Sequence, residues 1–156
     1  MERAEREKVT IDLMRLEDLD QVIEIEKLSF TNPWSRNAFA SELTDNHFST
    51  YIVAKVNSTI VGYAGMWLIV DEAHVTNVAV LPEYRGRGIG ELLMRSLMDI
   101  AWRNGARRMT LEVRKSNYVA QNLYSKLGFE PMGIRRGYYT DNREDAVIMW
   151  TDLIEK

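Results

Sequence analysis

Cysteine is absent from this sequence of 156 residues, and histidine occurs only twice. Without cysteine the chain has no disulfide bond, no thiolate zinc site and no cysteine nucleophile. Because small secreted domains usually depend on disulfide bonds, we expect the chain to be cytoplasmic. The two histidines, His47 and His74, also argue against a metal site built on a histidine cluster, so no metal is expected.

Long apolar runs and a surplus of one charge are also missing. The longest apolar stretch, Ile60–Val70, has 11 residues, whereas a membrane-spanning helix needs about 20. Lysine and arginine number 20 and aspartate and glutamate 23, a net charge of −3. This balance gives no reason to expect a nucleic acid or membrane partner. Met1–Lys8 alternates acidic and basic residues, so we expect a frayed end and not a signal peptide.

What is present fits one globular domain over residues 1–156, with 46% apolar and 28% charged residues. Alternating apolar residues predict strands at Val9–Leu16, Thr50–Val56, Thr59–Val70, Ala73–Val80, Met109–Val113, Glu130–Tyr138 and Ala146–Asp152. Apolar residues at helical spacing predict helices at Asp18–Phe30, Ser35–Leu43, from Ile89 to the Asn104-Gly105 cap, and at Ala120–Leu127. This order predicts an α+β fold with a mixed, mostly antiparallel sheet of about seven strands flanked by four helices.

The glycine-rich turn Arg85-Gly86-Arg87-Gly88-Ile89-Gly90 lies between the strand Ala73–Val80 and a strongly amphipathic helix. Glycines let backbone N–H groups turn inward, and the helix N-terminus adds a positive dipole end. Together with Arg85 and Arg87, these groups predict an anion site suited to a pyrophosphate. A plain turn that only starts the helix is the alternative.

Two common phosphate-binding motifs do not match this turn. A P-loop needs a lysine and a hydroxyl residue after its last glycine, but Glu91-Leu92 follow here. A dinucleotide-binding turn needs G-x-G-x-x-G, whereas the spacing here is G-x-G-x-G and Glu91 takes the place of the third glycine. Glu112 lies where a ribose-binding acid would lie, but too few residues remain after Gly90 for a doubly wound sheet.

The segment from Asn77 to Gly90, which contains this turn, resembles the acetyl-CoA signature of the GNAT N-acetyltransferases. The order of elements also resembles that family over about residues 9–153, as do Leu111-Glu112-Val113-Arg114, Ser116-Asn117 and Leu123-Tyr124-Ser125-Lys126-Leu127-Gly128-Phe129. Within the family the chain is similar to the RimI-type N-terminal alanine acetyltransferases of ribosomal proteins. The further marks of that similarity are Pro33-Trp34-Ser35, Arg135-Arg136-Gly137-Tyr138-Tyr139 and Arg143-Glu144-Asp145-Ala146.

The resemblance implies that acetyl-CoA is the cosubstrate. It implies that the strands Ala73–Val80 and Met109–Val113 splay apart and that the thioester lies in the gap. Strand backbone would hold the pantetheine arm, and the glycine turn would wrap the pyrophosphate. The residues expected to bind acetyl-CoA in this way are Val78, Ala79, Val80, Arg85, Gly86, Arg87, Gly88, Ile89, Gly90, Glu91 and Asn117.

Acyl transfer to an amine needs a base for the amine and a proton donor for the departing thiolate. Without cysteine, direct attack in a ternary complex is simpler than a covalent acyl-enzyme. Glu112, in a short apolar strand, is the candidate base, acting through a water, and a surface glutamate is the alternative. The resemblance makes Tyr124 the acid, where its apolar stripe alone predicts a buried core tyrosine. His74 is a second candidate base, but we expect nothing beside it to orient the ring, and His47 is expected in a solvated loop.

Trp34, Tyr138 and Tyr139 are the candidate walls for the acceptor, although such aromatic residues also pack locally. Glu144 and Asp145 either attract an ammonium group or only solubilise their loop. The leading hypothesis is acetyl transfer to the N-terminal α-amine of a protein, which the resemblance implies is a ribosomal protein that starts with alanine. The alternatives are a GNAT acetyltransferase of a small amine or of lysine side chains, and a non-catalytic acyl-CoA-binding module. The oligomeric state is left open.

Overall fold

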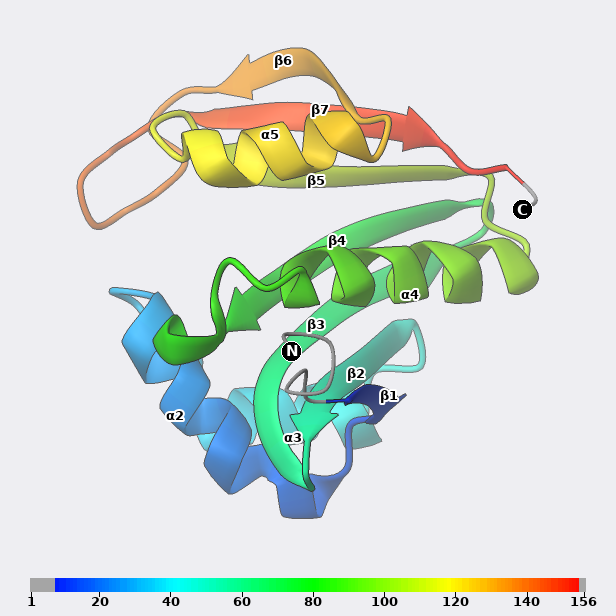
Figure 1. Cartoon of the computed structure of the whole chain (residues 1–156). Coiled ribbons are helices and arrows are strands. Elements are labelled where there is room, and N and C mark those ends of the chain that lie inside the picture. The colour runs from blue at the N-terminus through cyan, green and yellow to red at the C-terminus, as the bar shows by residue number, and fades with distance from the viewer. Residues whose placement is uncertain (1–7, 155–156) are drawn as a thin grey trace, which may run out of the picture.

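The computed structural model describes residues 8–154, which form one mixed sheet between two layers of helices (Figure 1). The strands are β1 (Val9–Leu13), β2 (Ser49–Val56), β3 (Thr59–Ile69), β4 (Glu72–Val80), β5 (Arg108–Arg114), β6 (Glu130–Arg135) and β7 (Ala146–Asp152). The helices are α2 (Leu19–Ser29), α3 (Arg36–Thr44), α4 (Ile89–Arg103) and α5 (Tyr118–Lys126), with short 3₁₀ turns η1 (Leu16–Asp18) and η2 (Pro82–Tyr84). The predicted α+β class is confirmed, with seven strands and four α-helices in the described residues.

The strand order in the sheet is β1-β2-β3-β4-β5-β7-β6, and all neighbouring pairs are antiparallel except β4 and β5. These two parallel strands pair only through Glu72–His74 and Arg108–Thr110. Beyond those residues they diverge, and Figure 1 shows the gap between them widening toward the left of the view. The two halves of the sheet are therefore joined by hydrogen bonds at one end only.

Alternate residues of the strands face different helix layers. Ile52 and Ala54 of β2 lie in the core that includes α4 and α5, while Tyr51 and Val53 lie in the core that includes α2 and α3. The first core is built largely on α4, whose buried side chains repeat at helical spacing. They are Ile89, Leu93, Met94, Leu97 and Ala101. Because the sheet separates two hydrophobic cores, an opening in the sheet connects its two faces.

β4 carries an irregularity beside the gap. In its pairing with β3, Gly65 lies opposite Asn77 and the next residue of β3 lies opposite Val75, so Thr76 is an extra residue. Such a β-bulge leaves the extra residue outside the ladder and bends the strand. The bulge comes shortly after His74, the last residue of β4 that pairs with β5. It therefore marks the point where the two strands part.

The first strand is shorter than predicted. It ends at Leu13 instead of Leu16, because the chain bends into η1, where Asp18 accepts a hydrogen bond from the Arg15 N–H at 2.8 Å. This local bond offers the backbone an alternative to a longer strand ladder. The frayed end predicted for residues 1–8 lies outside the described residues except for Lys8, which is exposed and precedes β1.

The last hairpin is also shorter than predicted. β6 ends at Arg135 instead of Tyr138, because the chain turns at Gly137, which has a positive φ of 60°. The Gly137 N–H donates to Asp145 Oδ1 across the loop at 2.8 Å, and the Tyr139 N–H donates to the Glu144 carbonyl at 3.2 Å. These two bonds close the loop after the strand ladder has ended at Arg135 and Ala146. Tyr138 thereby leaves the strand and joins the loop. Within residues 8–154, none of the helices is long and apolar enough to cross a membrane.

Candidate active site

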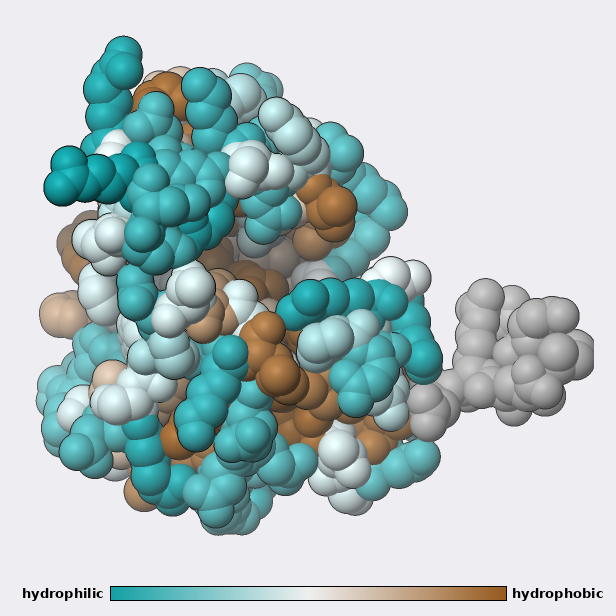
Figure 2. Space-filling model, turned by 90° about the vertical axis from the view of Figure 1, so that its left-hand side faces the viewer, coloured by the Kyte–Doolittle hydropathy of each residue, from teal (hydrophilic) through white to brown (hydrophobic). Residues whose placement is uncertain are grey.

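A groove of about 520 Å³ opens where β4 and β5 diverge. Its walls come from both strands, from α5, from the segment after α2, and from the loop between β6 and β7. Figure 2 views the molecule from the open side of the gap and shows a hollow with apolar residues in its depth. The predicted site residues that line the groove are Trp34, Val78, Glu112, Asn117, Tyr124, Tyr138 and Tyr139. The remaining ones, from Ala79 to Glu91, follow along the end of β4, the glycine turn and the start of α4.

Glu112 faces the α2 and α3 side of the sheet. Its neighbours Leu111 and Val113 are buried in the core with α4 and α5, so alternation along β5 turns Glu112 to the other face. One carboxylate oxygen lies 2.8 Å from His74 Nε2, and the other lies 3.5 Å from Arg135 Nε. Burial alone would raise the pKa of Glu112, but the hydrogen bond and charge of His74 and the charge of Arg135 hold that pKa below its ordinary value. The carboxylate is therefore ionised at neutral pH, although only 9% of the side chain is exposed.

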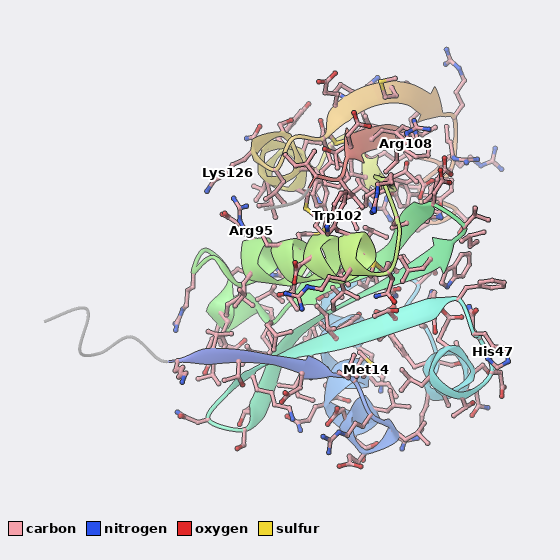
Figure 3. All side chains as sticks on the ribbon, turned by 90° about the vertical axis from the view of Figure 1, so that its right-hand side faces the viewer. Met14, His47, Arg95, Trp102, Arg108 and Lys126 are labelled. Atoms are coloured by element: carbon pink, nitrogen blue, oxygen red, sulfur yellow. The ribbon has the colours of Figure 1, made fainter. Side chains whose placement is uncertain are left out.

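The expectation that nothing orients His74 is wrong. The pairing of β4 with β5 places His74 opposite Thr110, and its ring reaches Glu112 on the same face of the sheet. The ring does not line the groove, so His74 influences the groove only through Glu112. His47 is exposed in the loop between α3 and β2, as predicted, and Figure 3 shows it at the periphery of the molecule.

Tyr124 reaches the groove from the α4 and α5 side of the sheet. Its ring packs in that core against Phe129, with 5.8 Å between the ring centres. Within residues 8–154, the Tyr124 hydroxyl has no hydrogen-bond partner. Burial raises the pKa of Tyr124 to about 12. The phenol therefore stays protonated at neutral pH and can donate one hydrogen bond into the groove.

The three aromatic residues predicted as acceptor walls are held by local packing. Trp34 packs on Phe39, with 5.2 Å between the ring centres, and its backbone N–H donates to Glu26 Oε2 at 2.8 Å. Tyr138 and Tyr139 stand edge to face, with 5.0 Å between the ring centres. These three residues therefore both pack locally and line the groove. The packing fixes the orientation of their rings on the groove wall.

Ion pairs hold the loop between β6 and β7. Arg114 of β5 pairs with Asp141 at 2.8 Å and with Glu144 at 3.2 Å, and its guanidinium lies 4.0 Å from the ring centre of Tyr139. Glu144 also accepts from a backbone N–H just before α5 at 2.7 Å. Neither Glu144 nor Asp145 lines the groove. Glu144 therefore ties the loop to β5 and to the start of α5, and Asp145 accepts from Gly137 inside the loop.

Two hydrogen bonds join that loop to the segment after α2. Thr31 Oγ1 donates to Asp141 Oδ2 at 2.5 Å, and Asn32 Nδ2 donates to Thr140 Oγ1 at 3.3 Å. All four residues line the groove. The partners are 110 and 108 positions apart in the chain, so no local sequence pattern indicates that these contacts bound the groove.

The glycine turn has the open backbone that an anion site needs. Gly86 and Gly88 have positive φ angles of 78° and 82°, and a Cβ at either position would meet no atom within 4 Å. Gly88 is the N-cap of α4 and supplies no side chain to accept from the first helical turn. The N–H groups at this helix N-terminus are therefore available to a ligand.

Charged side chains around the turn already have partners. Arg85 Nε donates to the Val80 carbonyl at 3.0 Å and so ties the turn to the end of β4. Glu91 accepts from Arg95 at 2.9 Å and from Lys126 at 2.8 Å. Figure 3 shows these two cations on the facing helices α4 and α5. They offset the negative charge of Glu91 beside a site suited to an anion.

Among the groove residues that were not predicted as site residues, two buried polar ones, Glu26 and Asn77, leave a signal in the sequence. Glu26 falls on the buried stripe of α2, where a charged residue needs hydrogen-bond partners. It is 2% exposed and accepts from the Trp34 N–H and from the Tyr63 hydroxyl. Asn77 likewise occupies a buried position in the alternation of β4. A polar residue at a position that periodicity assigns to the core is the common signal.

Comparisons with known proteins agree with each other. The Acetyltransferase (GNAT) family matches residues 19–129. A Bacillus subtilis protein provisionally named a ribosomal protein bS18-alanine N-acetyltransferase is 49% identical over 148 residues, which cover 95% of this chain and 98% of that protein. The Mycobacterium tuberculosis N-alpha-acetyltransferase RimI is 39% identical over 155 residues, which cover 96% of each. The crystal structure of the ribosomal-protein-S18-alanine N-acetyltransferase from Escherichia coli superposes with a TM-score of 0.86 at 35% identity, over 96% of each chain.

The buried carboxyl of Glu26 gives a prediction about stability and pH. Burial raises the pKa of Glu26 above its ordinary value, although Tyr63 and Trp34 donate to it. A raised folded-state pKa contributes stability that is lost as the pH rises through that pKa. Glu26→Gln has no charge to bury. The unfolding free energy of the variant minus that of the wild type, measured by urea denaturation, should therefore be more positive at pH 8 than at pH 5.

Glu24→Gln is the matched control, because Glu24 lies on the same helix with an exposed side chain paired to Lys27. Its stability relative to the wild type should not change between the two pH values. A difference between wild type and Glu26→Gln that stays constant, or that grows against the variant as the pH rises, would contradict a raised pKa for Glu26.

Proposed function

The chain belongs to the GNAT family of acetyltransferases, as its motifs predict, and we propose that it transfers the acetyl group of acetyl-CoA to the N-terminal α-amine of a protein. The proposed acceptor is a ribosomal protein that begins with alanine, as in the names of the relatives from Bacillus subtilis and Escherichia coli. The observation that carries this proposal is the groove between β4 and β5, which Glu112 lines from one face of the sheet and Tyr124 from the other. Donor and acceptor entering from opposite faces would meet there, as direct transfer requires.

The α4 and α5 side of the groove fits acetyl-CoA. A diphosphate can approach the backbone at Gly86 and Gly88, where a Cβ would occupy the space, and the N-terminus of α4 favours its negative charge. β4 has no strand partner on its β5 side after its third residue, so backbone groups of Val78–Val80 on that edge are available to the pantetheine arm, except the Val80 carbonyl, which accepts from Arg85. Asn117 lines the groove, and because its Oδ1 accepts from the Ala120 N–H at 3.1 Å, its amide nitrogen is left to donate.

The α2 and α3 side of the groove fits a peptide N-terminus. Trp34 and the Tyr138-Tyr139 pair stand on its walls, and the joined loops after α2 and after β6 bound it. An extended peptide offers backbone groups to such a slot, whereas a free small amine does not. A ribosomal acceptor would place the enzyme in the cytoplasm.

The acid–base properties of Glu112 favour an α-amine over a lysine. Because its pKa is held below the ordinary value, Glu112 is ionised but is a weak base. At pH 7.4 roughly a quarter of α-amines with a pKa near 7.7–8.0 are already neutral, against about one lysine in a thousand. A weak base therefore serves an α-amine far better. Glu112 would accept the amine proton through a water, with His74 holding the carboxylate in place.

Tyr124 would act on the sulfur that leaves. When bound, acetyl-CoA supplies a thioester whose carbonyl carbon the amine attacks and whose carbon–sulfur bond then breaks. With a pKa of about 12 for Tyr124, complete proton transfer to a thiolate is uphill by about 3.5 units. The phenol therefore stabilises the developing thiolate by donating a hydrogen bond, and its burial keeps that donor in a fixed direction.

The proposed cofactor cradle predicts a selective effect of one methyl group. In Gly88→Ala the Cβ enters the open space above the turn, so the KM for acetyl-CoA should rise about tenfold, equivalent to about 1.4 kcal/mol of lost binding. Gly105→Ala is the control, because Gly105 also has a positive φ, of 95°, with open space around it, but lies beyond the far end of α4. Both variants carry similar backbone strain, so an equal change of KM in both would contradict the cradle.

The proposed acceptor is tested with three amines in steady-state acetyl-transfer assays. They are a peptide that starts with alanine, the same lysine-containing peptide with a blocked N-terminus, and spermidine. The free peptide should have the highest kcat/KM, because only it combines a neutral α-amine with backbone for the slot. If the blocked peptide or spermidine is acetylated as fast or faster, the enzyme acts instead on lysine side chains or on small amines.

A further inference from the structure

A row of three residues crosses the sheet toward the bulge in β4. Tyr51 of β2 pairs with Gly65 of β3, and Gly65 lies opposite Asn77 of β4. The Tyr51 ring lies so close to Gly65 that a Cβ there would be 2.0 Å from the ring atom Cε2. Gly65 does not have a positive φ, so glycine is needed here for space and not for backbone conformation. The missing side chain lets the ring lie across β3 and extend to β4.

The Tyr51 hydroxyl reaches both residues of the bulge. It lies 2.9 Å from Thr76 Oγ1 and 3.1 Å from Asn77 Oδ1. It also lies 3.0 Å from Glu42 Oε1, which accepts from the Trp67 indole N–H at 2.7 Å. Burial raises the pKa of Tyr51, so the hydroxyl keeps its proton at neutral pH. Hydrogen bonds to α3 and to β4 thus meet at one tyrosine oxygen.

The bulge lies in the groove, but Tyr51 does not. Val75, Thr76, Asn77 and Val78 line the groove, and Tyr51 is not among the lining residues. The Tyr51 ring lies near the groove residue Trp34, with 6.5 Å between the ring centres. The Tyr51 hydroxyl, in contrast, contacts groove residues only in β4. At the bulge β4 pairs with β3 alone, and Thr76 is outside that ladder, so side-chain contacts add to the pairing with β3 in holding this part of the strand in one conformation.

We propose that Tyr51 is a positioning residue that fixes the β4 bulge, so that a backbone N–H of the bulge is aimed at the carbonyl oxygen of the bound acetyl thioester. This inference rests on the proposed function, because it needs an acetyl thioester in the groove. Negative charge grows on that oxygen as the amine attacks, and N–H donors that are already in place stabilise it without reorganising. The ring of Tyr51 supplies packing, and its hydroxyl supplies the fixed geometry of the bulge.

Tyr51→Phe tests this role because it removes the hydroxyl and keeps the ring. The kcat should fall about tenfold, the effect of one ordinary hydrogen bond, while the KM values for acetyl-CoA and for the peptide stay unchanged. Difference infrared spectroscopy of bound acetyl-CoA, labelled with carbon-13 at the acetyl carbonyl and without acceptor, provides a second measurement. The carbonyl stretch should lie at higher wavenumber in Tyr51→Phe than in the wild type, because the carbonyl is less polarised.

Trp67→Phe is the matched control. It removes another donor to the same Glu42 oxygen but leaves the contacts of Tyr51 with β4, so it should keep the wild-type carbonyl frequency. The frequency and not kcat is compared for this control, because the Trp67 ring also packs on His74, with 6.1 Å between the ring centres. Thr76→Val removes only the partner hydroxyl at the bulge and should shift the frequency as Tyr51→Phe does. It is measured alone if Tyr51→Phe does not fold. In the double variant the losses of kcat should not add, since both changes remove the same contact.

An unchanged carbonyl frequency in Tyr51→Phe and Thr76→Val overturns the inference, even if kcat falls, because a merely structural contact would slow turnover without altering polarisation. A frequency shift of equal size in Trp67→Phe also overturns it. Failure of the proposed function would look different. In that case the carbonyl frequency would still differ between the wild type and Tyr51→Phe, but the wild type would not acetylate the peptide.

Discussion

The site depends on one break in hydrogen bonding, the point at which β4 and β5 stop pairing. Their parallel ladder ends at His74 and Thr110, but both strands continue, so backbone N–H and C=O groups on the facing edges need other partners. A ligand that carries amide groups of its own can supply them, and the pantetheine arm of acetyl-CoA is such a ligand. The groove and the bulge in β4 lie at this break, and so do the two candidate catalytic residues, Glu112 and Tyr124.

At the break, the candidate base and the candidate acid lie on opposite faces of the sheet. Glu112 faces the α2 and α3 side, where His74 and Arg135 keep it ionised. Tyr124 belongs to the α4 and α5 side, where burial keeps it protonated. In a pocket on one face, a carboxylate and a phenol could hydrogen-bond to each other and neither would be available to a substrate. The sheet keeps them apart, and the gap gives both access to one space.

Local features of this arrangement could be predicted from the sequence, and features that depend on strand register could not. Periodicity places the helices and strands within a few residues of their observed ends, and Glu112 and Tyr124 fall in contiguous motifs that line the groove. The contact of His74 with Glu112 joins residues 38 positions apart and depends on how β4 pairs with β5. The reach of Tyr51 to Thr76 depends on a single extra residue in β4. The two strands that were predicted about three residues too long, β1 and β6, are followed by turns that side-chain hydrogen bonds help to close, and periodicity does not detect such bonds.

The central claim is that donor and acceptor meet through the sheet, from opposite faces. A crystal structure with a conjugate that links coenzyme A covalently to the α-nitrogen of an alanine-starting peptide tests it most directly. The account predicts that the linker passes between β4 and β5, with the coenzyme on the side of Tyr124 and the peptide on the side of Glu112. A structure in which both parts of the conjugate lie on one face of the sheet, or in which the peptide lies outside the groove, would contradict it.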